Sequence, residues 1–426
     1  MALATPEGYT PQSAATLASF LARIEPVRRR LGGDAASWHI AEVGDGNLNL
    51  VFIVKGPSGG VAVKQALPYV RLVGESWPLP LSRAHYEHMA LREQARLTGT
   101  LVPDVLHYDE TLALIVMELL EPHIIMRRGM IAATVYPKFA DDISTFMART
   151  LYFTSDLALT ADRKKAMIAA FAGNSALCKI TEDLIFTDPY KIAELNRWTS
   201  PQLDGFARRW REDGDLKIAV SRLKLKFLSS AEAMLHGDLH TGSVMLTPGN
   251  TRIIDPEFAF MGPMGFDIGA VLANFLINYF SHDGHEEKAG DRDGYREWVL
   301  ATTAEIWASF RAKFVDLWRG NATGDAYPAP LFADKAGAAG LEKERQAYMD
   351  RLWADTLGFA AAKMTRRVLG LAHNIDLEWI KDADQRAQCE ARVLTLSREM
   401  MVNTKRFASI APVIDAAREL RKERLP

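Results

Sequence analysis

The stretch that decides the fold runs from Leu235 to Phe260 and reads "LHGDLHTGSVMLTPGNTRIIDPEFAF". Two short polar turns separate the apolar, strand-like runs within it. The first turn carries Asp238, and the second carries Asp255, with Glu257 two residues further on. Because alternate side chains of an extended segment lie on the same face, Asp255 and Glu257 are expected to point the same way. Carboxylates on turns between strands predict a functional site at this point of the chain.

The chemistry of these turns follows from their carboxylates. "HGDLH" resembles the catalytic loop of kinase-like phosphotransferases, in which the aspartate, here Asp238, accepts a hydroxyl proton. "IIDPE" follows seventeen residues later (255 − 238), where kinases carry D-F-G, so Asp255 is predicted to bind Mg²⁺, which prefers oxygen ligands. Ser243 stands where kinases place a second metal-binding Asn. A serine hydroxyl is a poorer ligand, so Glu257 is predicted to supply the missing oxygen.

Two upstream motifs fit the same interpretation. In "EVGDGNLNLVFIVKG", Gly44 and Gly46 would let backbone amides approach a phosphate closely, although this loop taken alone favours a plain hairpin tip. "VAVK" ends a second predicted strand with Lys64 and matches the kinase strand whose lysine holds ATP phosphates. The helix that follows offers Glu87 as the ion-pair partner that would orient Lys64, with Glu93 as a weaker candidate.

A possible hinge between two lobes lies in "VMELLEP". The backbone groups of Glu118, Leu119 and Leu120 could hydrogen-bond an adenine ring there. A plain strand end fits the motif equally well when it is taken alone.

The remaining polar residues near the turns are expected to be structural. In kinase-like folds an aspartate at the position of Asp267, in "GPMGFDIG", braces the catalytic loop through hydrogen bonds to its backbone. His236 and His240 have no third ligand at a spacing that a zinc site would need. His236 is therefore expected to be a packed or loop-bracing histidine.

The composition indicates a globular protein without a strongly charged partner. Among 426 residues, 48% are hydrophobic, and 51 Lys and Arg oppose 53 Asp and Glu for a net charge of −2. We therefore expect neither a nucleic acid nor a membrane as a partner. The most apolar window, 258–280, is interrupted by Pro263 and Asp267. The two cysteines, Cys178 and Cys389, are too few for a disulfide framework, and the N-terminus does not resemble a signal peptide; both features fit a cytoplasmic protein.

The periodicity along the chain predicts an α+β fold of two lobes. Residues 1–121 combine a helical lead-in with antiparallel strands and one helix, which predicts a β-rich N-lobe. Residues 122–426 are mostly helical, apart from a strand pair around Leu246 and Ile253. We expect a bilobal protein-kinase-like architecture with the active site in the cleft between the lobes.

Taken together, five motifs resemble one family: "GDGNLNLVF", "VGESWPLP", "HGDLHTGS", "DPEFAFMGPMGFDIG" and "RRVLGLAH". They look like the methylthioribose kinases, a family of aminoglycoside-phosphotransferase-like kinases, from about Glu42 to His373. The resemblance implies phosphorylation of the 1-hydroxyl of 5-methylthioribose in methionine salvage, with ATP and Mg²⁺ as cofactors. It also implies a cytoplasmic homodimer whose partner is a small sugar.

The resemblance also implies roles for individual residues. Asp238 would be the base, and Arg366 or Arg367 would meet the sugar or the transferring phosphoryl group. Two adjacent helical arginines point ~100° apart, so one is expected to face the cleft and the other to brace acidic residues. Trp77 would offer the thioether tail an apolar surface, or serve only the structure. The other implied contacts are to ATP or Mg²⁺, by Asn49, Lys64, Glu118, Leu119, Leu120, Asp255, Pro256 and Glu257, and to the sugar, by Gly74, Glu75 and Ser76.

Two other functions remain open at this point. The first is another small-molecule kinase of the same fold, acting on choline, homoserine or an aminoglycoside. A choline or aminoglycoside site would need an acidic or aromatic cage for a cation, and the sequence does not reveal one. The second is a catalytically inactive kinase-like binding module. The joint presence of Lys64, Asp238 and Asp255 argues against it.

Overall fold

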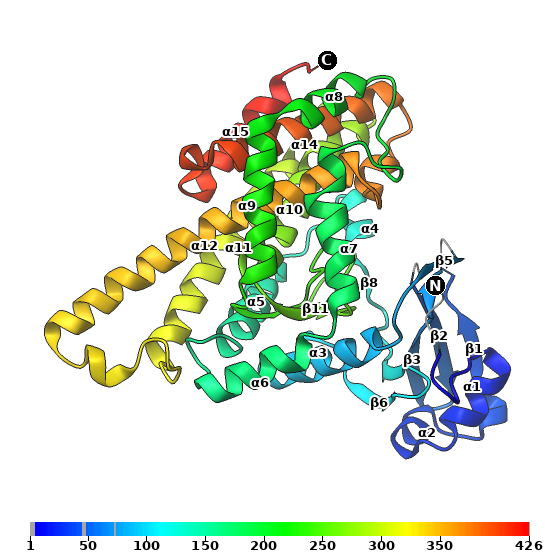
Figure 1. The fold of residues 1–426 in the computed structure, drawn as a ribbon. Coiled ribbons are helices and arrows are strands. Elements are labelled where there is room, and N and C mark those ends of the chain that lie inside the picture. Colours follow the sequence, from blue (N-terminus) through cyan, green and yellow to red (C-terminus); the bar gives the residue numbers. More distant parts are fainter. Residues whose placement is uncertain (1–4, 45–47, 72–73, 426) are drawn as a thin grey trace.

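The N-terminal part of the chain is built around a five-stranded antiparallel sheet (Figure 1). The computed structural model describes residues 5–44, 48–71 and 74–425. The sheet has the order β1-β2-β3-β7-β6. Its strands are β1 (His39–Glu42), β2 (Asn49–Gly56), β3 (Gly59–Ala66), β6 (Val105–Asp109) and β7 (Leu114–Glu118).

The alternation of apolar residues explains how this sheet packs. Phe52 and Val54 of β2 and Val61 and Val63 of β3 are buried on one face. Two short helices, α1 (Ala14–Leu21) and α2 (Glu25–Leu31), pack their leucines and valine into the same apolar cluster. A two-stranded ribbon, β4 (Tyr69–Val70) with β5 (Gly74–Pro78), then leads into helix α3 (Arg83–Thr98). The predicted lead-in, strands and single helix are all present.

The rest of the chain is mostly helical. Short strands interrupt it: β8 (Ile124–Ile125) pairs with β10 (Val244–Thr247), β10 with β11 (Asn250–Ile253), and β9 (Ala233–Leu235) with β12 (Phe260–Gly262). The helices are α4 (Met126–Ile131), α5 (Phe139–Phe153), α6 (Ala161–Phe171), α7 (Ser175–Phe186), α8 (Asp204–Glu212), α9 (Gly214–Ser229), α10 (Gly265–Ser281), α11 (Asp293–Gly320), α12 (Lys335–Leu369), α13 (Ile375–Glu378), α14 (Ala383–Val402) and α15 (Ile410–Lys422). The α+β architecture of a β-rich part and a larger helical part is therefore confirmed.

Helix α10 is the centre of the helical part, and every one of its residues is buried. Two glycines let α12 approach it closely. A Cβ added to Gly265 would lie 2.8 Å from the backbone nitrogen of Thr356, and one on Gly269 would lie 2.7 Å from that of Ala360. This contact fixes α12 against the segment that follows β12. It thereby determines where the C-terminal turns of α12 lie relative to the "HGDLH" loop.

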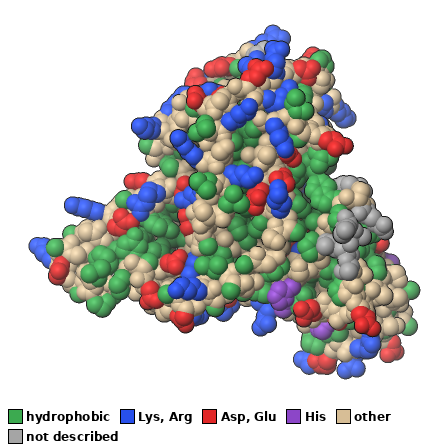
Figure 2. Space-filling view, in the orientation of Figure 1, with side chains coloured by type: hydrophobic (Ala, Val, Ile, Leu, Met, Phe, Trp, Pro, Cys, Tyr) green, Lys and Arg blue, Asp and Glu red, His purple; other side chains and the backbone are tan. Residues whose placement is uncertain are grey.

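Figure 2 shows acidic and basic side chains interspersed over the face in view, in keeping with the net charge of −2. Among the helices that the structure describes, none is both long enough and apolar enough to cross a membrane.

Candidate active site

Lys64 and Glu87 form the ion pair that the sequence predicts. Lys64 lies on β3 and Glu87 on α3, and the Lys64 Nζ donates a hydrogen bond of 2.9 Å to Glu87 Oε1. Both side chains are mostly buried, with 13% and 3% of their surface exposed. The weaker candidate, Glu93, instead accepts a hydrogen bond of 2.9 Å from Arg96 Nε. The partner of Lys64 on α3 is therefore Glu87.

Lys64 also reaches the second turn of the opening stretch. Its Nζ contacts the carboxylate of Asp255 and lies 3.9 Å from Glu257 Oε2. Burial on its own would lower the pKa of Lys64, but the carboxylates of Asp255, Glu257 and Glu87 outweigh it and raise the pKa above its usual range. Lys64 therefore stays a cation at neutral pH and can hold an anionic group beside these carboxylates.

Three carboxylates meet at this point and offer a set of oxygen ligands. Oxygens of Glu87, Asp255 and Glu257 all lie within 4.8 Å of one another. Asp255 has a φ of 68°, in the left-handed region that residues other than glycine rarely adopt, and 46% of its side chain is exposed. Hard oxygen donors with one partly open carboxylate are the chemistry that Mg²⁺ prefers. The residues present therefore fit this ion.

Glu257 is held in place by a buried polar network. Asn49 Nδ2 donates a hydrogen bond of 2.9 Å to Glu257 Oε2, and Arg83 Nη2 donates one of 3.0 Å to Asn49 Oδ1. Arg83 Nε lies 3.5 Å from the Glu257 carboxylate. The implied contact of Asn49 with ATP stays a prediction, because its amide is engaged in both directions here. Sequence reasoning missed Arg83, since an arginine at the start of a helix carries no signal that it is buried.

The "HGDLH" loop is braced as the sequence predicts. The Asp267 carboxylate accepts hydrogen bonds from the backbone nitrogens of His236, at 2.6 Å, and of Gly237, at 3.0 Å. The His236 ring lies between Ile254 O, 2.9 Å from its Nε2, and the backbone nitrogen of Asp238, which donates to its Nδ1 at 3.3 Å. Both expectations, a bracing Asp267 and a loop-bracing His236, are confirmed.

Ser243 joins the two turns rather than standing free. Its hydroxyl donates a hydrogen bond of 2.9 Å to the backbone carbonyl of Asp238. Its own carbonyl accepts one of 3.0 Å from the nitrogen of Ile254, next to Asp255. The serine thus fixes the loop of the candidate base to the loop of the candidate metal ligands.

The side chain of Asp238 lies among hydrogen-bond donors and cations. The nitrogen of Gly242 donates to His240 Nδ1 at 2.9 Å, so the proton of a neutral imidazole lies on Nε2, 3.3 Å from Asp238 Oδ2. Burial lowers the pKa of His240 to about 3, which keeps it neutral. Burial would raise the pKa of Asp238, but the hydrogen bond from His240 and the nearby Lys363 and Arg367 hold it well below its usual range. Asp238 is therefore ionised at neutral pH.

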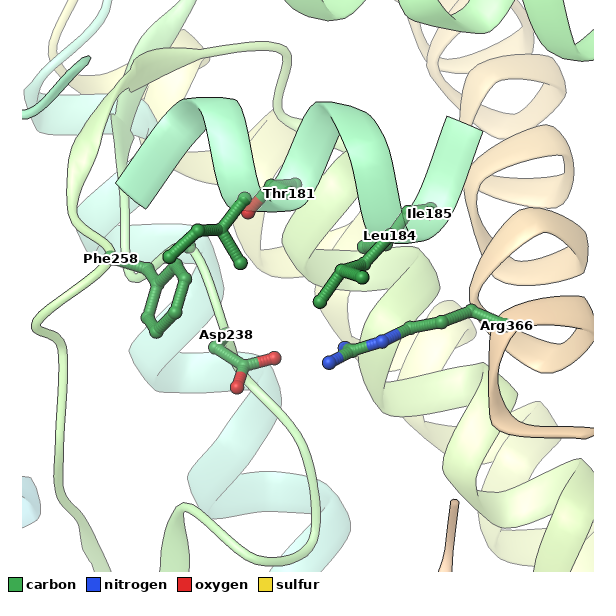
Figure 3. A pocket seen from close by; sticks show the side chains of 8 residues that line it. Thr181, Leu184, Ile185, Asp238, Phe258 and Arg366 are labelled. Carbon is green, nitrogen blue, oxygen red and sulfur yellow. The ribbon is translucent and has the colours of Figure 1, made fainter. Parts of the chain in front are cut away.

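Asp238 opens onto a small pocket with an apolar wall (Figure 3). Its lining combines three regions, namely the loop residues Gly237, Asp238 and Phe258, the α7 residues Ile180, Thr181, Leu184 and Ile185, and Arg366 of α12. A carboxylate and a guanidinium therefore face each other beside apolar side chains. The sequence did not single out α7, because its apolar residues resemble those of any half-buried helix.

The two adjacent arginines of α12 point in different directions, as expected. Figure 3 shows Arg366 extending toward Asp238. Arg367 instead donates a hydrogen bond of 2.8 Å from Nη1 to the carbonyl of Ala372, a backbone group and not the acidic residue that was expected, and is only 8% exposed. It is Arg366 that faces the pocket.

The remaining residues of the predicted site lie around the same region. Glu118 ends β7, and its carboxylate pairs with Arg252 at 3.2 Å, while Leu119 and Leu120 follow it. The segment from Gly74 to Pro78, which includes Glu75 and Ser76, forms β5. Trp77 packs against the apolar cluster that Ile180 and Phe258 also join. Pro256 is buried, Gly44 is exposed, and Gly46 lies outside the described residues. Contacts of these residues with ATP or a sugar stay predictions.

Comparisons with known proteins agree on one class. Residues 39–306 match the phosphotransferase enzyme family. The chain is 45% identical to methylthioribose kinase 1 of Oryza sativa subsp. japonica over 412 residues, 96% of this chain and 95% of that protein. It is 44% identical to methylthioribose kinase of Escherichia coli O45:K1 (strain S88 / ExPEC) over 414 residues, 97% and 98% of the two chains. A solved choline/ethanolamine kinase family protein from Mesorhizobium loti is similar with a TM-score of 0.41 and 15% identity over 96% of this chain and 100% of that one, a likeness that bears on neither substrate nor mechanism.

Proposed function

The chain belongs to the methylthioribose kinase family, and from this premise we propose that it transfers the γ-phosphoryl group of ATP to the 1-hydroxyl of 5-methylthioribose. The products are 5-methylthioribose 1-phosphate and ADP, and the reaction serves methionine salvage. We also propose that the protein works as a cytoplasmic homodimer, as its family resemblance implies. The observation that carries the proposed reaction is the Asp238 carboxylate facing Arg366 across a small pocket.

Asp238 accepts the proton of the 1-hydroxyl as the oxygen attacks the γ-phosphorus. A carboxylate that is ionised before the reaction is ready for this task. His240 holds the carboxylate in one orientation from Oδ2, and Ser243 and His236 hold the backbone of the same residue. Arg366 would meet the negative charge that develops on the transferring phosphoryl group, and a fixed cation stabilises such charge.

Lys64, Asp255 and Glu257 serve the nucleotide. Asp255 and Glu257 would hold Mg²⁺, which neutralises charge on phosphate oxygens when it is bound. Lys64 binds phosphate oxygens, and Glu87 fixes the direction in which its ammonium points. Asn49 and Arg83 keep the Glu257 carboxylate in place for this role.

The apolar wall of the pocket suits the methylthio group of the proposed substrate. Ile180 and Leu184 on α7 and Phe258 offer surface to a thioether, and Trp77 packs against the same cluster. Hydroxyl groups of the sugar would meet Asp238 and the loop around it. Choline and aminoglycosides are cations, and Arg366 in the lining of this pocket repels a cation.

The substrate is tested by comparing acceptors at saturating ATP and Mg²⁺. We expect release of ADP with 5-methylthioribose, and at least about a hundredfold lower kcat/KM with choline, homoserine or kanamycin. Equal or faster turnover of one of these acceptors would assign the protein to another kinase of the same fold. No consumption of ATP with any acceptor would identify a binding module.

Replacing Glu257 by Gln should raise the Mg²⁺ concentration needed for half-maximal activity, by about tenfold, because a neutral amide binds this ion more weakly than a carboxylate. A titration of activity with Mg²⁺ at fixed ATP measures the change. The control is Glu93→Gln, an equivalent replacement at a carboxylate that pairs with Arg96. An unchanged titration for Glu257→Gln would return the ligand role to Ser243 or to water.

A further inference from the structure

A buried lysine that no part of the proposed reaction uses lies beside Asp238. Lys363 belongs to α12, three residues before Arg366, and is 5% exposed. Its Nζ lies 3.7 Å from Asp238 Oδ1 and 3.9 Å from the centroid of the Phe266 ring. Among the described residues, this Nζ has no hydrogen-bond partner.

An ammonium group in this position is costly for folding. A buried charge is normally compensated by hydrogen bonds, and Lys363 has only an ion-pair distance and the face of an aromatic ring. Lys164 shows the usual arrangement: it is 3% exposed, donates to the carbonyls of Thr154, at 3.2 Å, and Glu232, at 2.5 Å, and lies 3.3 Å from Asp156 Oδ2. Lys363 donates no such hydrogen bond to a backbone carbonyl among the described residues. Its position therefore points to a role at Asp238 rather than in the core.

We propose that Lys363 is a positioning residue for Asp238, whose ammonium charge keeps this carboxylate ionised and thereby extends the activity of the enzyme further into acidic pH. The proposal rests on the proposed function, in which Asp238 is the base. Lys363 acts through Asp238 and does not line the pocket, so it has no contact with the sugar.

The electrostatics around both residues support this role. Lys363 faces Asp238, Asp267, His236, Arg366 and Arg367, and Asp238 faces Lys363, Arg366, Arg367, His236, His240 and Arg127. The Asp267 carboxylate is already engaged by two backbone nitrogens, so Asp238 is the carboxylate left for Lys363 to stabilise. Burial lowers the pKa of Lys363 to about 8, which leaves it protonated at neutral and acidic pH.

The sign of the expected effect follows from these charges. A cation beside a carboxylate favours the ionised form and lowers its pKa, so removing the cation raises the pKa of Asp238. The enzyme then loses its base as the pH falls through this raised value. An opposite charge within 4–6 Å shifts a carboxyl pKa by roughly 1–3 units, and we expect a displacement of about one pH unit or more.

The test is the pH dependence of Lys363→Met, which keeps the length of the side chain and removes the charge. We would measure kcat/KM for 5-methylthioribose from pH 4 to 8 at saturating ATP and Mg²⁺, and divide it by the wild-type value at each pH, because the pKa of Asp238 starts well below its usual range and its raised value lies in the acidic part of this scan. This ratio cancels the ionisation of ATP. It should be level near neutral pH and fall toward acidic pH. Lys363→Arg, which retains the charge, should give a level ratio.

Lys164→Met is the matched control for a purely structural loss. It leaves two carbonyls without their donor, so it should lower the melting temperature while its ratio stays level across pH. Lys363→Met should lower the melting temperature less than Lys164→Met does, because it removes a charge that makes no hydrogen bond. Lys363→Gln also removes the charge and carries the same test if Lys363→Met folds poorly.

The outcomes separate this proposal from the proposed function. A level ratio for both neutral variants, in an enzyme that Asp238→Asn inactivates, overturns the role of Lys363 and leaves the reaction intact. A wild-type protein that does not phosphorylate 5-methylthioribose overturns both. An Asp238→Asn variant with wild-type turnover does so as well, because Lys363 would then act on a residue that is not the base.

Discussion

Replacing Asp238 by Asn should lower kcat by roughly 10²–10⁴-fold, the range that loss of a general base normally gives, while ATP binding stays nearly intact. An amide has the shape of the carboxylate but cannot accept the proton of the attacking hydroxyl. Its oxygen can still accept the hydrogen bond from His240 Nε2. The backbone of the residue keeps its bonds to His236 and Ser243, so the loop should hold its shape.

The measurement pairs steady-state kinetics with calorimetric titration of ATP in the presence of Mg²⁺. The matched control is Asp183→Asn on α7, the helix that forms the pocket wall. Asp183 is 40% exposed and pairs with Lys179, so its variant should keep kcat within about twofold. A kcat within about threefold of wild type for Asp238→Asn would mean that another group accepts the proton.

The sequence predicts those site residues that belong to short motifs of recognisable composition and spacing. Asp238 and Asp255 lie on two turns, and the spacing between these turns is what indicates a kinase-like site. Lys64 and Glu87 are 23 residues apart, on a strand and the helix that follows, and their pairing required only that the two elements be adjacent. Asp267 was found in the same way, from the motif "GPMGFDIG" that contains the start of α10.

The residues that could not be predicted are brought into the site by packing between distant parts of the chain. The hydrogen bond between Asn49 and Glu257 joins residues 208 positions apart. Neither of the two motifs contains a signal that predicts contact with the other. Arg83 and Lys363 are charged, and charged residues on helices are normally exposed. Their burial depends on how α3 and α12 meet the two loops. No local pattern carries that information.

Arg366 and Arg367 could likewise be only partly predicted. Helical geometry predicts that their side chains diverge, but it does not predict which of them faces the pocket. The structure assigns this place to Arg366. Only a measurement on both residues tests whether this assignment has the catalytic consequence expected of it.

Arg366→Met should therefore lower kcat by roughly 10²–10³-fold, the loss that follows when one fixed group that stabilises transition-state charge is removed. Arg367→Met should act mainly on stability, because the hydrogen bond from Arg367 to the Ala372 carbonyl closes the C-terminal end of α12. Each variant is the control for the other, since both remove a guanidinium from the same turn. Steady-state kinetics and thermal melting of the pair give the comparison. A fall in kcat confined to Arg366→Met indicates contact with the phosphoryl group in the transition state, and a rise in KM alone indicates contact with the sugar. A larger loss of kcat in Arg367→Met would reverse the assignment.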